Sequence, residues 1–352
     1  MNHRLALDGV LSPAEAQLTA RHLAALQQPN GMIPWYPGGH CDPWNHVESA
    51  MALDVAGFHG AARRAYGWLA AVQRADGSWH NYYRADGSIE DGKLDTNVCA
   101  YVATGLLHHL RITGDIDFVR SLFPSASRAL EFVLAQRRAD GIPLWAIEHE
   151  ARPWDYALLT GTASIQHALR CGARVADELG CPRPDWIEAA DTMAEVIRAD
   201  CAGRAALAGG SSHFEPKTRW AMDWYYPVLT GALSGGAAKS RLAEGWQAFS
   251  MEGLGIRCVN DEPWVTASET AECALAFTAI GDHDTATDLL RWTRTHRRDD
   301  GSYWTGMVYP DEIRFPFDEH TSYTAAAVLL AVDAIVGATP ASDLFCPAAL
   351  VD

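Results

Sequence analysis

The sequence predicts an all-α fold, built from about six pairs of helices arranged in two concentric rings. Amphipathic helical segments alternate along the chain with segments that are apolar on nearly every side. An amphipathic helix shows one face to water, whereas a helix that is apolar all round is buried, so the alternation indicates an outer and an inner ring. No linker or low-complexity segment interrupts the series, and residues 1–352 are therefore predicted to form a single domain.

The outer helices are recognised by apolar residues at the i, i+3, i+4 and i+7 positions of one helix face. Ala65, Trp68, Leu69 and Val72 show this spacing, and Pro13 marks the first turn of the first helix. The outer helices are expected at residues 12–27, 60–74, 115–138, 184–203, 236–249 and 283–298.

The inner helices begin at polar residues and continue as apolar runs. Asp95, Thr96 and Asn97 are all helix-capping types, and the residues that follow them show no clear polar face. The inner helices are expected at residues 42–57, 95–107, 154–179, 224–234, 265–280 and 319–336.

The loops at the two ends of the predicted rings differ in length. The inner helices are followed by short turns that end at glycine, and they are preceded by long loops rich in Trp and Tyr. Long loops carry binding and catalytic residues more often than short turns do, so the N-terminal ends of the inner helices form the expected functional rim. Two short period-two runs, WHNYY and SYWTGMVY, predict hairpins on the same rim.

Charge and composition exclude several classes of function. The net charge is −16 and the pI is near 5.2, which disfavours binding to nucleic acid or to an anionic membrane. The N-terminal segment has no apolar core of signal-peptide length, so a cytoplasmic protein is expected. The eight cysteines are scattered without metal-ligand spacing, and no phosphate-binding loop, GxGxxG, GxSxG or HExxH motif occurs. Neither a metal nor a cofactor is predicted.

Acidic residues recur on the predicted rim, and almost every one has a Trp or Tyr beside it. Helix capping explains an isolated Asp at a helix start and contributes roughly 0.5–2 kcal/mol. Capping does not explain the aromatic neighbours, whereas sugar binding does, because pyranose rings stack on Trp while acids and amides bind hydroxyl groups. The residues expected to bind substrate are Asp42, Trp44, His46, Asp95, Asn97, Trp154, Tyr156, Asp223, Trp224, Tyr225, Trp264, Glu269, Glu319, His320 and Tyr323.

The helical pairs resemble an (α/α)6 barrel, the toroid of six-hairpin glycosidases with glucoamylase-like architecture and of terpenoid cyclases with protein prenyltransferases. The resemblance covers most of the chain. The turn formed by Gln73, Gly77 and Trp79 also matches the Gln-xxx-Gly-x-Trp repeat of the cyclases, with looser echoes in QQPNGMIPW, QRRADGIPLW and RRDDGSYW. The same turn is equally expected of any helix pair of this kind.

The glycosidase resemblance implies hydrolysis of a glycosidic bond in an oligosaccharide by two carboxylates, with inversion as the commoner outcome. In glucoamylase-like enzymes the general acid precedes the third inner helix and the base precedes the sixth. Those places hold Asp155 and either Asp318 or Glu319, and Glu262 competes for either role. This chain departs from the glucoamylase pattern around Asp155, which leaves the catalytic pair open.

Two other classes of function fit part of the sequence. A terpenoid cyclase or prenyltransferase-like toroid would use the aromatic residues, but the Asp-x-Asp-Asp and Asp-Asp-xx-Asp motifs of that branch are absent. A non-catalytic sugar-binding protein would not need so many converging acids.

The bare-barrel size and the Ala- and Arg-rich chain also resemble actinobacterial α-mannosidases that trim methylated mannose polysaccharides, which implies an α-linked polysaccharide substrate. The pattern specifies neither the sugar, its linkage nor an oligomeric state.

Overall fold

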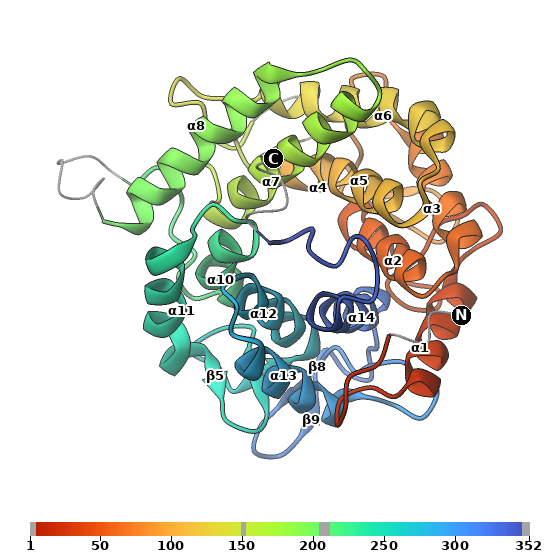
Figure 1. Ribbon diagram of the computed structural model, residues 1–352, viewed down its shortest axis with the longest axis vertical. Helices are drawn as coiled ribbons and strands as arrows, with labels where there is room; N and C mark the ends of the chain where they lie inside the picture. Colours follow the sequence, from red (N-terminus) through yellow and green to blue (C-terminus); the bar gives the residue numbers. More distant parts are fainter. Residues whose placement is uncertain (1–4, 149–152, 204–211, 347–352) are drawn as a thin grey trace.

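The chain folds into two nested rings of helices around a common axis (Figure 1). The structure is a computed structural model that describes residues 5–148, 153–203 and 212–346. The outer helices are α1 (Pro13–Leu26), α3 (His59–Val72), α6 (Ile116–Ala135), α8 (Pro184–Cys201), α11 (Gly235–Phe249) and α13 (His283–Trp292). The inner helices are α2 (Pro43–Val55), α4 (Thr96–Ala100), α5 (Val102–Thr113), α7 (Leu159–Glu178), α10 (Ala221–Leu229), α12 (Ala267–Ala279) and α14 (Ser322–Val336).

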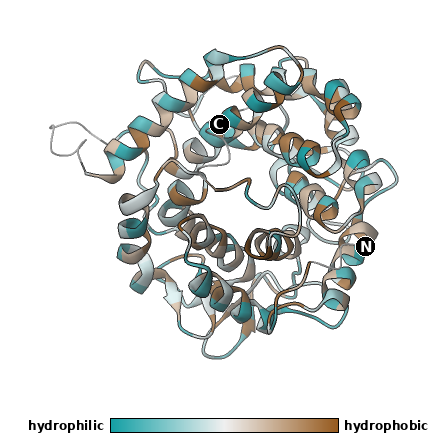
Figure 2. Cartoon of the chain, in the orientation of Figure 1, coloured by the Kyte–Doolittle hydropathy of each residue, from teal (hydrophilic) through white to brown (hydrophobic). Residues whose placement is uncertain are grey.

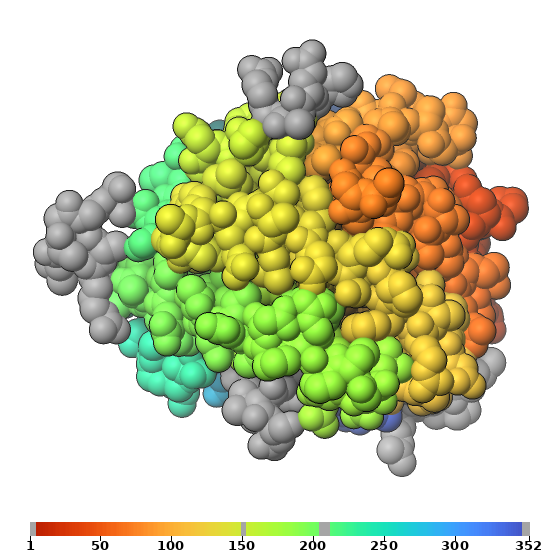
Figure 3. All heavy atoms as spheres, turned by 90° about the horizontal axis from the view of Figure 1, so that it is seen from above, coloured from red at the N-terminus to blue at the C-terminus, as the bar shows by residue number. Residues whose placement is uncertain are grey.

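The predicted difference between the two rings is present in the structure. The inner helices α12 and α14 are apolar on most sides, and the outer helices carry their hydrophilic residues outward (Figure 2). Around the outer surface, successive segments of the chain lie side by side in sequence order (Figure 3). In the described residues no helix is both long and apolar enough to cross a membrane.

Short strands occupy the long-loop rim. A two-stranded sheet joins β1 (Tyr82–Tyr83) to β2 (Ile89–Asp91), and a second joins β3 (Leu94–Asp95) to β4 (Ala146–Ile147). The five-stranded antiparallel sheet has the order β5-β6-β7-β8-β9 and comprises β5 (Ser250–Met251), β6 (Gly255–Arg257), β7 (Trp264–Thr266), β8 (Gly306–Val308) and β9 (Ile313–Arg314). Hairpins were predicted in two of these places, but the sheet that unites β5 to β9 was not.

The C-terminal segment closes one end of the ring. After α14 the chain crosses the centre of the ring at the ends of the inner helices, as the dark-blue trace in Figure 1 shows. His167 of α7 hydrogen-bonds the Leu344 carbonyl oxygen at 3.0 Å, and Phe345 stacks on the same imidazole with ring centroids 5.1 Å apart. Leu344 is buried in this contact. The interior is therefore approached from the opposite end, where the inner helices begin.

Two inner helices begin later than the sequence predicted. The start expected at residue 154 lies at Leu159, because the preceding loop bonds instead to β4: the Trp154 amide donates to the Ala146 carbonyl at 2.9 Å. The start expected at residue 319 lies at Ser322, after the N-cap Thr321. These shifts leave Asp155 and Asp318 on exposed loops, with Glu319 half-buried beside Asp318.

The Gln-xxx-Gly turn is a repeated contact between successive outer helices. The Gln73 side-chain amide donates to the Gly77 carbonyl and to the Ser125 carbonyl of α6, each at 2.8 Å. Gln27 makes the same pair of bonds, to the Gly31 carbonyl at 3.0 Å and to the Ala61 carbonyl of α3 at 2.9 Å. Each glutamine also accepts a hydrogen bond from an arginine of that next outer helix.

Glycine is required where these turns touch the next helix. Gly31 and Gly77 both have positive φ, and a Cβ atom would lie 2.2 Å and 2.3 Å from the carbonyl oxygens of Arg64 and Arg128 respectively. Gly301, in the last such turn of the chain, faces α1: its Cβ would lie 2.7 Å from the Thr19 nitrogen. The last turn therefore packs on the first outer helix, and the ring closes by the same contact that builds it.

The sequence RADGS occurs twice and provides a matched test of this contact. Gly77 and Gly87 occupy identical turns, with φ of +91° and +83°, but nothing lies within 4 Å of a Cβ at Gly87. We expect Gly77→Ala to lower the free energy of unfolding by about 1–3 kcal/mol more than Gly87→Ala, because only the first creates a backbone clash. Urea unfolding of both variants measures the difference. If both variants lost the same free energy of unfolding, the positive φ of Gly77, and not its contact with the next helix, would be the reason for glycine at that position.

Candidate active site

A pocket of about 350 Å³ lies at the centre of the ring, at the N-terminal ends of the inner helices. Its walls come from α2, α4, α10, α12 and α14 and from the loops that precede them. It is lined by Trp35, Asp42, Trp44, Asn45, Glu48, Asn81, Tyr82, Lys93, Asp95, Val98, Trp145, Met222, Ser268, Glu269, Glu272 and Tyr323.

Five carboxylates converge on this pocket. Asp42 and Glu48 come from the start of α2, Glu269 and Glu272 from the start of α12, and Asp95 precedes α4. On each of the two glutamate-bearing helices most residues are buried, so these acids lie in a largely buried helix. Buried acids are rarely placed in this way for packing, so the pocket is the principal candidate for the active site.

Asp42 and Asp95 are equivalent groups on neighbouring inner helices. Each caps its helix: Asp42 accepts from the Asn45 amide at 3.0 Å, and Asp95 accepts from the amides of residues 97 and 98. Each also accepts from a tryptophan indole, Trp35 at 2.6 Å and Trp145 at 2.5 Å. Burial raises the pKa of both carboxyl groups, against the opposing effect of these donors.

Glu48 is the group best prepared to hold a proton. Burial, together with the negative charges of Asp42 and Glu269, raises its pKa to about 8. The Trp44 indole donates to its Oε1 at 2.9 Å, and the Tyr101 hydroxyl donates to the same oxygen at 3.4 Å. Oε2 is therefore free to carry the proton of the neutral carboxylic acid.

The two glutamates of α12 have different environments. Glu272 accepts hydrogen bonds from the hydroxyls of Tyr225 and Tyr226, one on each oxygen, and burial beside the charge of Glu48 raises its pKa. Glu269 is only half-buried and accepts from Thr266, from the Ser268 hydroxyl at 2.7 Å and from the Cys258 thiol at 3.2 Å. These three donors fix the orientation of the Glu269 carboxylate.

Aromatic rings surround the acids. The Trp44 ring lies 5.3 Å from that of Tyr101 and 5.8 Å from that of Tyr226, so it extends from α2 toward the opposite side of the pocket. Trp35 lies between Tyr82 and Tyr323, with centroid distances of 5.7 Å and 5.0 Å. Carboxylates enclosed by half-buried indoles and phenols are suited to binding a sugar ring.

A second aromatic group continues outward from the pocket. Trp145 lines the pocket, and its ring lies 4.9 Å from that of Trp154 and 5.5 Å from that of Tyr156. The Lys93 ammonium lies 4.4 Å from the centroid of Trp145. Trp154 and Tyr156 are themselves half-buried, so they extend the aromatic surface beyond the acids.

The structure places the three residues predicted to be catalytic outside the pocket. Asp155 and Glu262 are exposed, and the Asp318 side chain is 79% exposed and pairs with Arg314 at 3.1 Å. None of the three lines the pocket or contacts its acids among the described residues. Their catalytic roles remain predictions from the sequence.

Five of the residues predicted to bind substrate do line the pocket. They are Asp42, Trp44, Asp95, Glu269 and Tyr323. Tyr225 contacts it indirectly, through Glu272. The others predicted to bind substrate lie elsewhere on or below the rim: His46, Asn97, Trp154, Tyr156, Asp223, Trp224, Trp264, Glu319 and His320.

Several of these outlying residues have evident structural roles. His46 is buried with both ring nitrogens occupied, since it accepts from the Ile33 amide at 3.1 Å and lies 2.9 Å from the Ala65 carbonyl oxygen. The Trp224 indole donates to the Arg241 carbonyl at 2.8 Å, and the Trp264 indole donates to the Phe315 carbonyl at 3.1 Å.

The two buried glutamates were not among the residues predicted to be catalytic or to bind substrate. Glu48 lies two turns into α2, and Glu272 lies three residues after Glu269, on the same helix face. The available signal was a charged residue inside an apolar inner helix, which is costly unless it has a function. Trp145 and Lys93 come from loops and carried no comparable signal.

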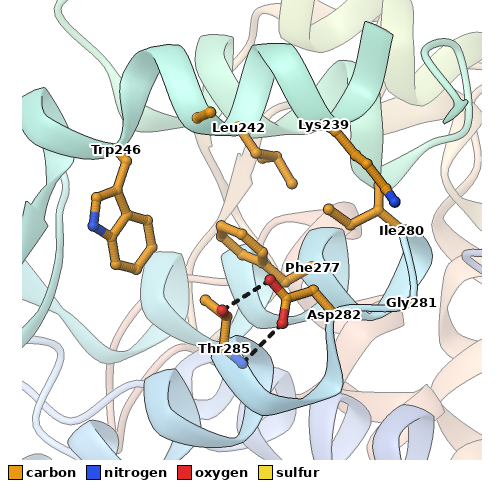
Figure 4. Close-up of a pocket in the computed structure, with 9 residues that line it drawn as sticks. Lys239, Leu242, Trp246, Phe277, Ile280, Gly281, Asp282 and Thr285 are labelled. Atoms are coloured by element: carbon orange, nitrogen blue, oxygen red, sulfur yellow. Dashed lines mark hydrogen bonds between the residues drawn. The ribbon is translucent and has the colours of Figure 1, made fainter. Parts of the chain in front are cut away.

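A larger surface depression lies at the opposite rim, between α11, α12 and α13 (Figure 4). Its volume is about 670 Å³, but Asp282 is the single acid that lines it. That carboxylate already caps α13, accepting from the Thr285 amide at 3.1 Å and from its hydroxyl at 2.9 Å. The depression therefore offers no pair of carboxylates for chemistry, despite its size.

Comparison with known proteins decides the family. No protein-family model matches the chain. The chain is 45% identical over 337 residues to MMP endo-(1,4)-3-O-methyl-alpha-D-mannosidase of Mycolicibacterium hassiacum, covering 96% of this chain and 90% of that protein. The chain belongs to this family of glycoside hydrolases. The resemblance of the sequence to mannosidases of methylated mannose polysaccharides is confirmed, and the cyclase and sugar-binding alternatives are set aside.

Solved structures with the same fold act on sugars in several ways. The chain is similar to a wild-type glycosidase, with a TM-score of 0.71 and 16% identity, covering 95% of this chain and 100% of that one. It is also similar to a D-mannose isomerase (TM-score 0.67, 14% identity, 91% and 96% covered). A sugar epimerase from a ruminal bacterium matches with a TM-score of 0.65 and 12% identity, over 89% and 95% of the two chains. At such identities the likeness shows the fold alone.

No group of three or more His, Cys, Asp or Glu in the described part of the chain is arranged to hold a metal ion. The eight cysteines carry free thiols.

Replacing Glu48 by glutamine tests its protonation state. A carboxyl group whose pKa is about 8 in the folded protein and 4.5 otherwise binds its proton more tightly when folded, so its contribution to stability is lost as pH rises from about 5 to 8. We expect the free energy of unfolding of Glu48→Gln, relative to wild type, to increase over this interval by more than about 1 kcal/mol. Urea unfolding of wild type and variant at about pH 5 and about pH 8 measures this change in the free-energy difference.

The exposed Glu262→Gln variant is the control for loss of one carboxylate. If the difference in the free energy of unfolding between Glu48→Gln and wild type did not change with pH, the raised pKa of Glu48 would be contradicted.

Proposed function

We propose that this chain cleaves internal α-(1,4) bonds of a 3-O-methylmannose polysaccharide. The proposal combines the substrate named for the 45% identical relative with the central pocket of this structure. The observation that carries it is the convergence of five carboxylates with indole and phenol rings at one end of the ring. Hydrolysis of a glycosidic bond needs one protonated and one ionised carboxyl group on opposite sides of the scissile bond.

Glu48 is proposed as the general acid. At neutral pH a carboxyl group with a pKa of about 8 is mostly protonated, which is the state needed to donate to the glycosidic oxygen as the bond breaks. The indole of Trp44 and the hydroxyl of Tyr101 both bind Oε1 and fix the orientation of the group. After donation the carboxylate retains these two hydrogen bonds, which support its negative charge.

Glu269 is proposed as the general base. It comes from α12, which is separated from α2 by α14 around the inner ring, so it approaches the pocket from a different wall than Glu48 (Figure 1). Its three hydrogen-bond donors fix the orientation of the carboxylate toward the pocket. In the proposed step it removes a proton from water, the water oxygen attacks the anomeric carbon, and Glu48 protonates the departing sugar oxygen. Attack opposite the leaving group inverts the anomeric configuration.

Glu272 is proposed as a positioning residue. Both of its oxygens are held by tyrosine hydroxyls, so it is poorly placed to donate or accept a proton from substrate. Besides burial, the charge of Glu48 raises the pKa of Glu272, and the charges of Asp42 and Glu269 raise the pKa of Glu48. The cluster thereby retains protons that separate carboxylates would lose at neutral pH.

An endo-acting enzyme must also hold sugar units on both sides of the bond. The aromatic surface that extends outward through Trp145, Trp154 and Tyr156 supports binding of one such arm. The Trp35 and Tyr82 group on another wall supports the second.

The remaining parts of the proposal concern the fold and the compartment. We propose that the alternating outer and inner helices form one complete (α/α)6 barrel domain over residues 1–352. The free thiols and the acidic charge are consistent with a cytoplasmic enzyme.

Product release from methylmannose polysaccharide tests the catalytic pair. We expect Glu48→Gln and Glu269→Gln each to lower kcat by roughly 10²- to 10⁴-fold, because each removes a proton-transfer group, while the fold is retained. Proton NMR of the first product should show the β-anomer, as inversion of an α-linkage requires.

Asp155→Asn and Asp318→Asn are the matched controls, since both acids lie exposed on the same rim. They should keep kcat within about threefold of wild type. Full activity of Glu48→Gln beside an inactive Asp155→Asn would overturn the assignment in favour of the pair predicted from the sequence.

A further inference from the structure

The central pocket has an apolar side whose function the catalytic acids do not explain. We propose that Val98 and Met222 form the contact surface for the 3-O-methyl group of the sugar, and that this surface makes the enzyme selective for methylated substrate. The inference rests on the proposed function and specifies how that site distinguishes a methyl ether from a free hydroxyl.

The pocket is chemically asymmetric. Its walls from α2, α12 and α14 are polar, with four carboxylates and a tyrosine hydroxyl. Val98 of α4 and Met222 of α10 are the aliphatic and thioether side chains among its lining residues, and no lining residue comes from α7, which lies between those two helices.

The start of α7 is packed tightly against both neighbours. A Cβ atom at Gly161 would lie 3.5 Å from the Asn97 Cβ of α4, and the Thr160 hydroxyl donates to Asp223 of α10 at 2.7 Å. These contacts hold α4 and α10 on either side of the α7 N-terminus. Val98 and Met222 therefore lie on the α4 and α10 side of the pocket, where Asp95, the N-cap of α4, is the one carboxylate that also lines it, and the other four acids come from α2 and α12.

A methyl ether needs this kind of surface. Unlike a hydroxyl it cannot donate a hydrogen bond, so a buried acceptor facing it would lose its partner. An apolar contact instead removes the methyl group from water, and the flexible thioether of Met222 can adapt to its shape. Val98 is 8% exposed, which leaves a small patch of its surface facing the pocket. Free hydroxyls would face the carboxylates, so the two walls together fix the orientation of the ring.

The expected selectivity is modest, because one methylene in an apolar pocket is worth roughly 10- to 200-fold in kcat/KM. The test compares α-(1,4)-mannooligosaccharides of equal length, with and without 3-O-methyl groups. Met222→Gln keeps the length of the side chain and adds polarity, and Val98→Thr keeps its shape. We expect each variant to reduce the ratio of kcat/KM for methylated over unmethylated substrate by about tenfold.

Two further variants make the result specific. Met222→Leu keeps the apolar contact and should retain the wild-type ratio within about twofold. Leu18→Gln makes the same kind of polar change on the outer helix α1, at a side chain that is 36% exposed, and should leave the ratio unchanged.

The outcomes separate the two claims. An unchanged ratio in both Met222→Gln and Val98→Thr overturns the methyl-recognition surface, as does an equal loss on both substrates. Failure of wild type to cleave either oligosaccharide, or the parent polysaccharide, overturns the proposed function itself. If Met222→Gln does not fold, the ratio measured for Val98→Thr decides alone.

Discussion

The ring depends on the close approach of loop glycines to the backbone of the next outer helix at three places. Gly31 packs on α3, Gly77 on α6 and Gly301 on α1, and in each place a Cβ atom would lie under 3 Å from main-chain atoms. Glutamine side chains reinforce two of these contacts with hydrogen bonds to carbonyl groups of the same neighbouring helix. Glu15 of α1 completes the closure by pairing with Arg294 and Arg297. Because each hairpin is located by the next, the inner helices are left with their N-terminal ends on one rim.

That convergence determines the chemistry of the pocket. The positive ends of α2, α4 and α12 favour nearby negative charge, and caps such as Asp42 and Asp95 use that field. The acids are nevertheless too many and too buried for all to ionise, since desolvation and mutual repulsion both oppose charge. Glu48 keeps its proton because burial and the charges of Asp42 and Glu269 raise its pKa, against the opposing effect of the hydrogen bonds from Trp44 and Tyr101.

Much of the fold could be predicted because the two kinds of helix have distinct patterns. The amphipathic segments 60–74 and 283–298 correspond closely to α3 and to α13 with the 3₁₀ turn that follows it. The period-two run SYWTGMVY marked the place of β8, but the sheet that unites β5 to β9 could not be predicted, because its other strands are two or three residues long and their pairing depends on loops brought together by the ring.

The site was predicted where capping chemistry marked it. Asp42 and Asp95 are capping residues beside tryptophans, and both line the pocket. Asp155 and Asp318 were expected at helix starts, but α7 and α14 begin later, and the intervening residues pair with neighbouring loops instead. Glu48 was assigned no role, because it lies inside a helix that periodicity describes as buried.

The most direct test of the proposed catalytic pair is a crystal structure of the Glu48→Gln variant soaked with a 3-O-methylated α-(1,4)-mannooligosaccharide. We expect a sugar ring in the central pocket, stacked near Trp44, with the scissile oxygen beside residue 48 and the anomeric carbon facing Glu269. Oligosaccharide bound instead at the rim around Asp155 and Asp318, or in the depression between α11 and α13, would contradict it.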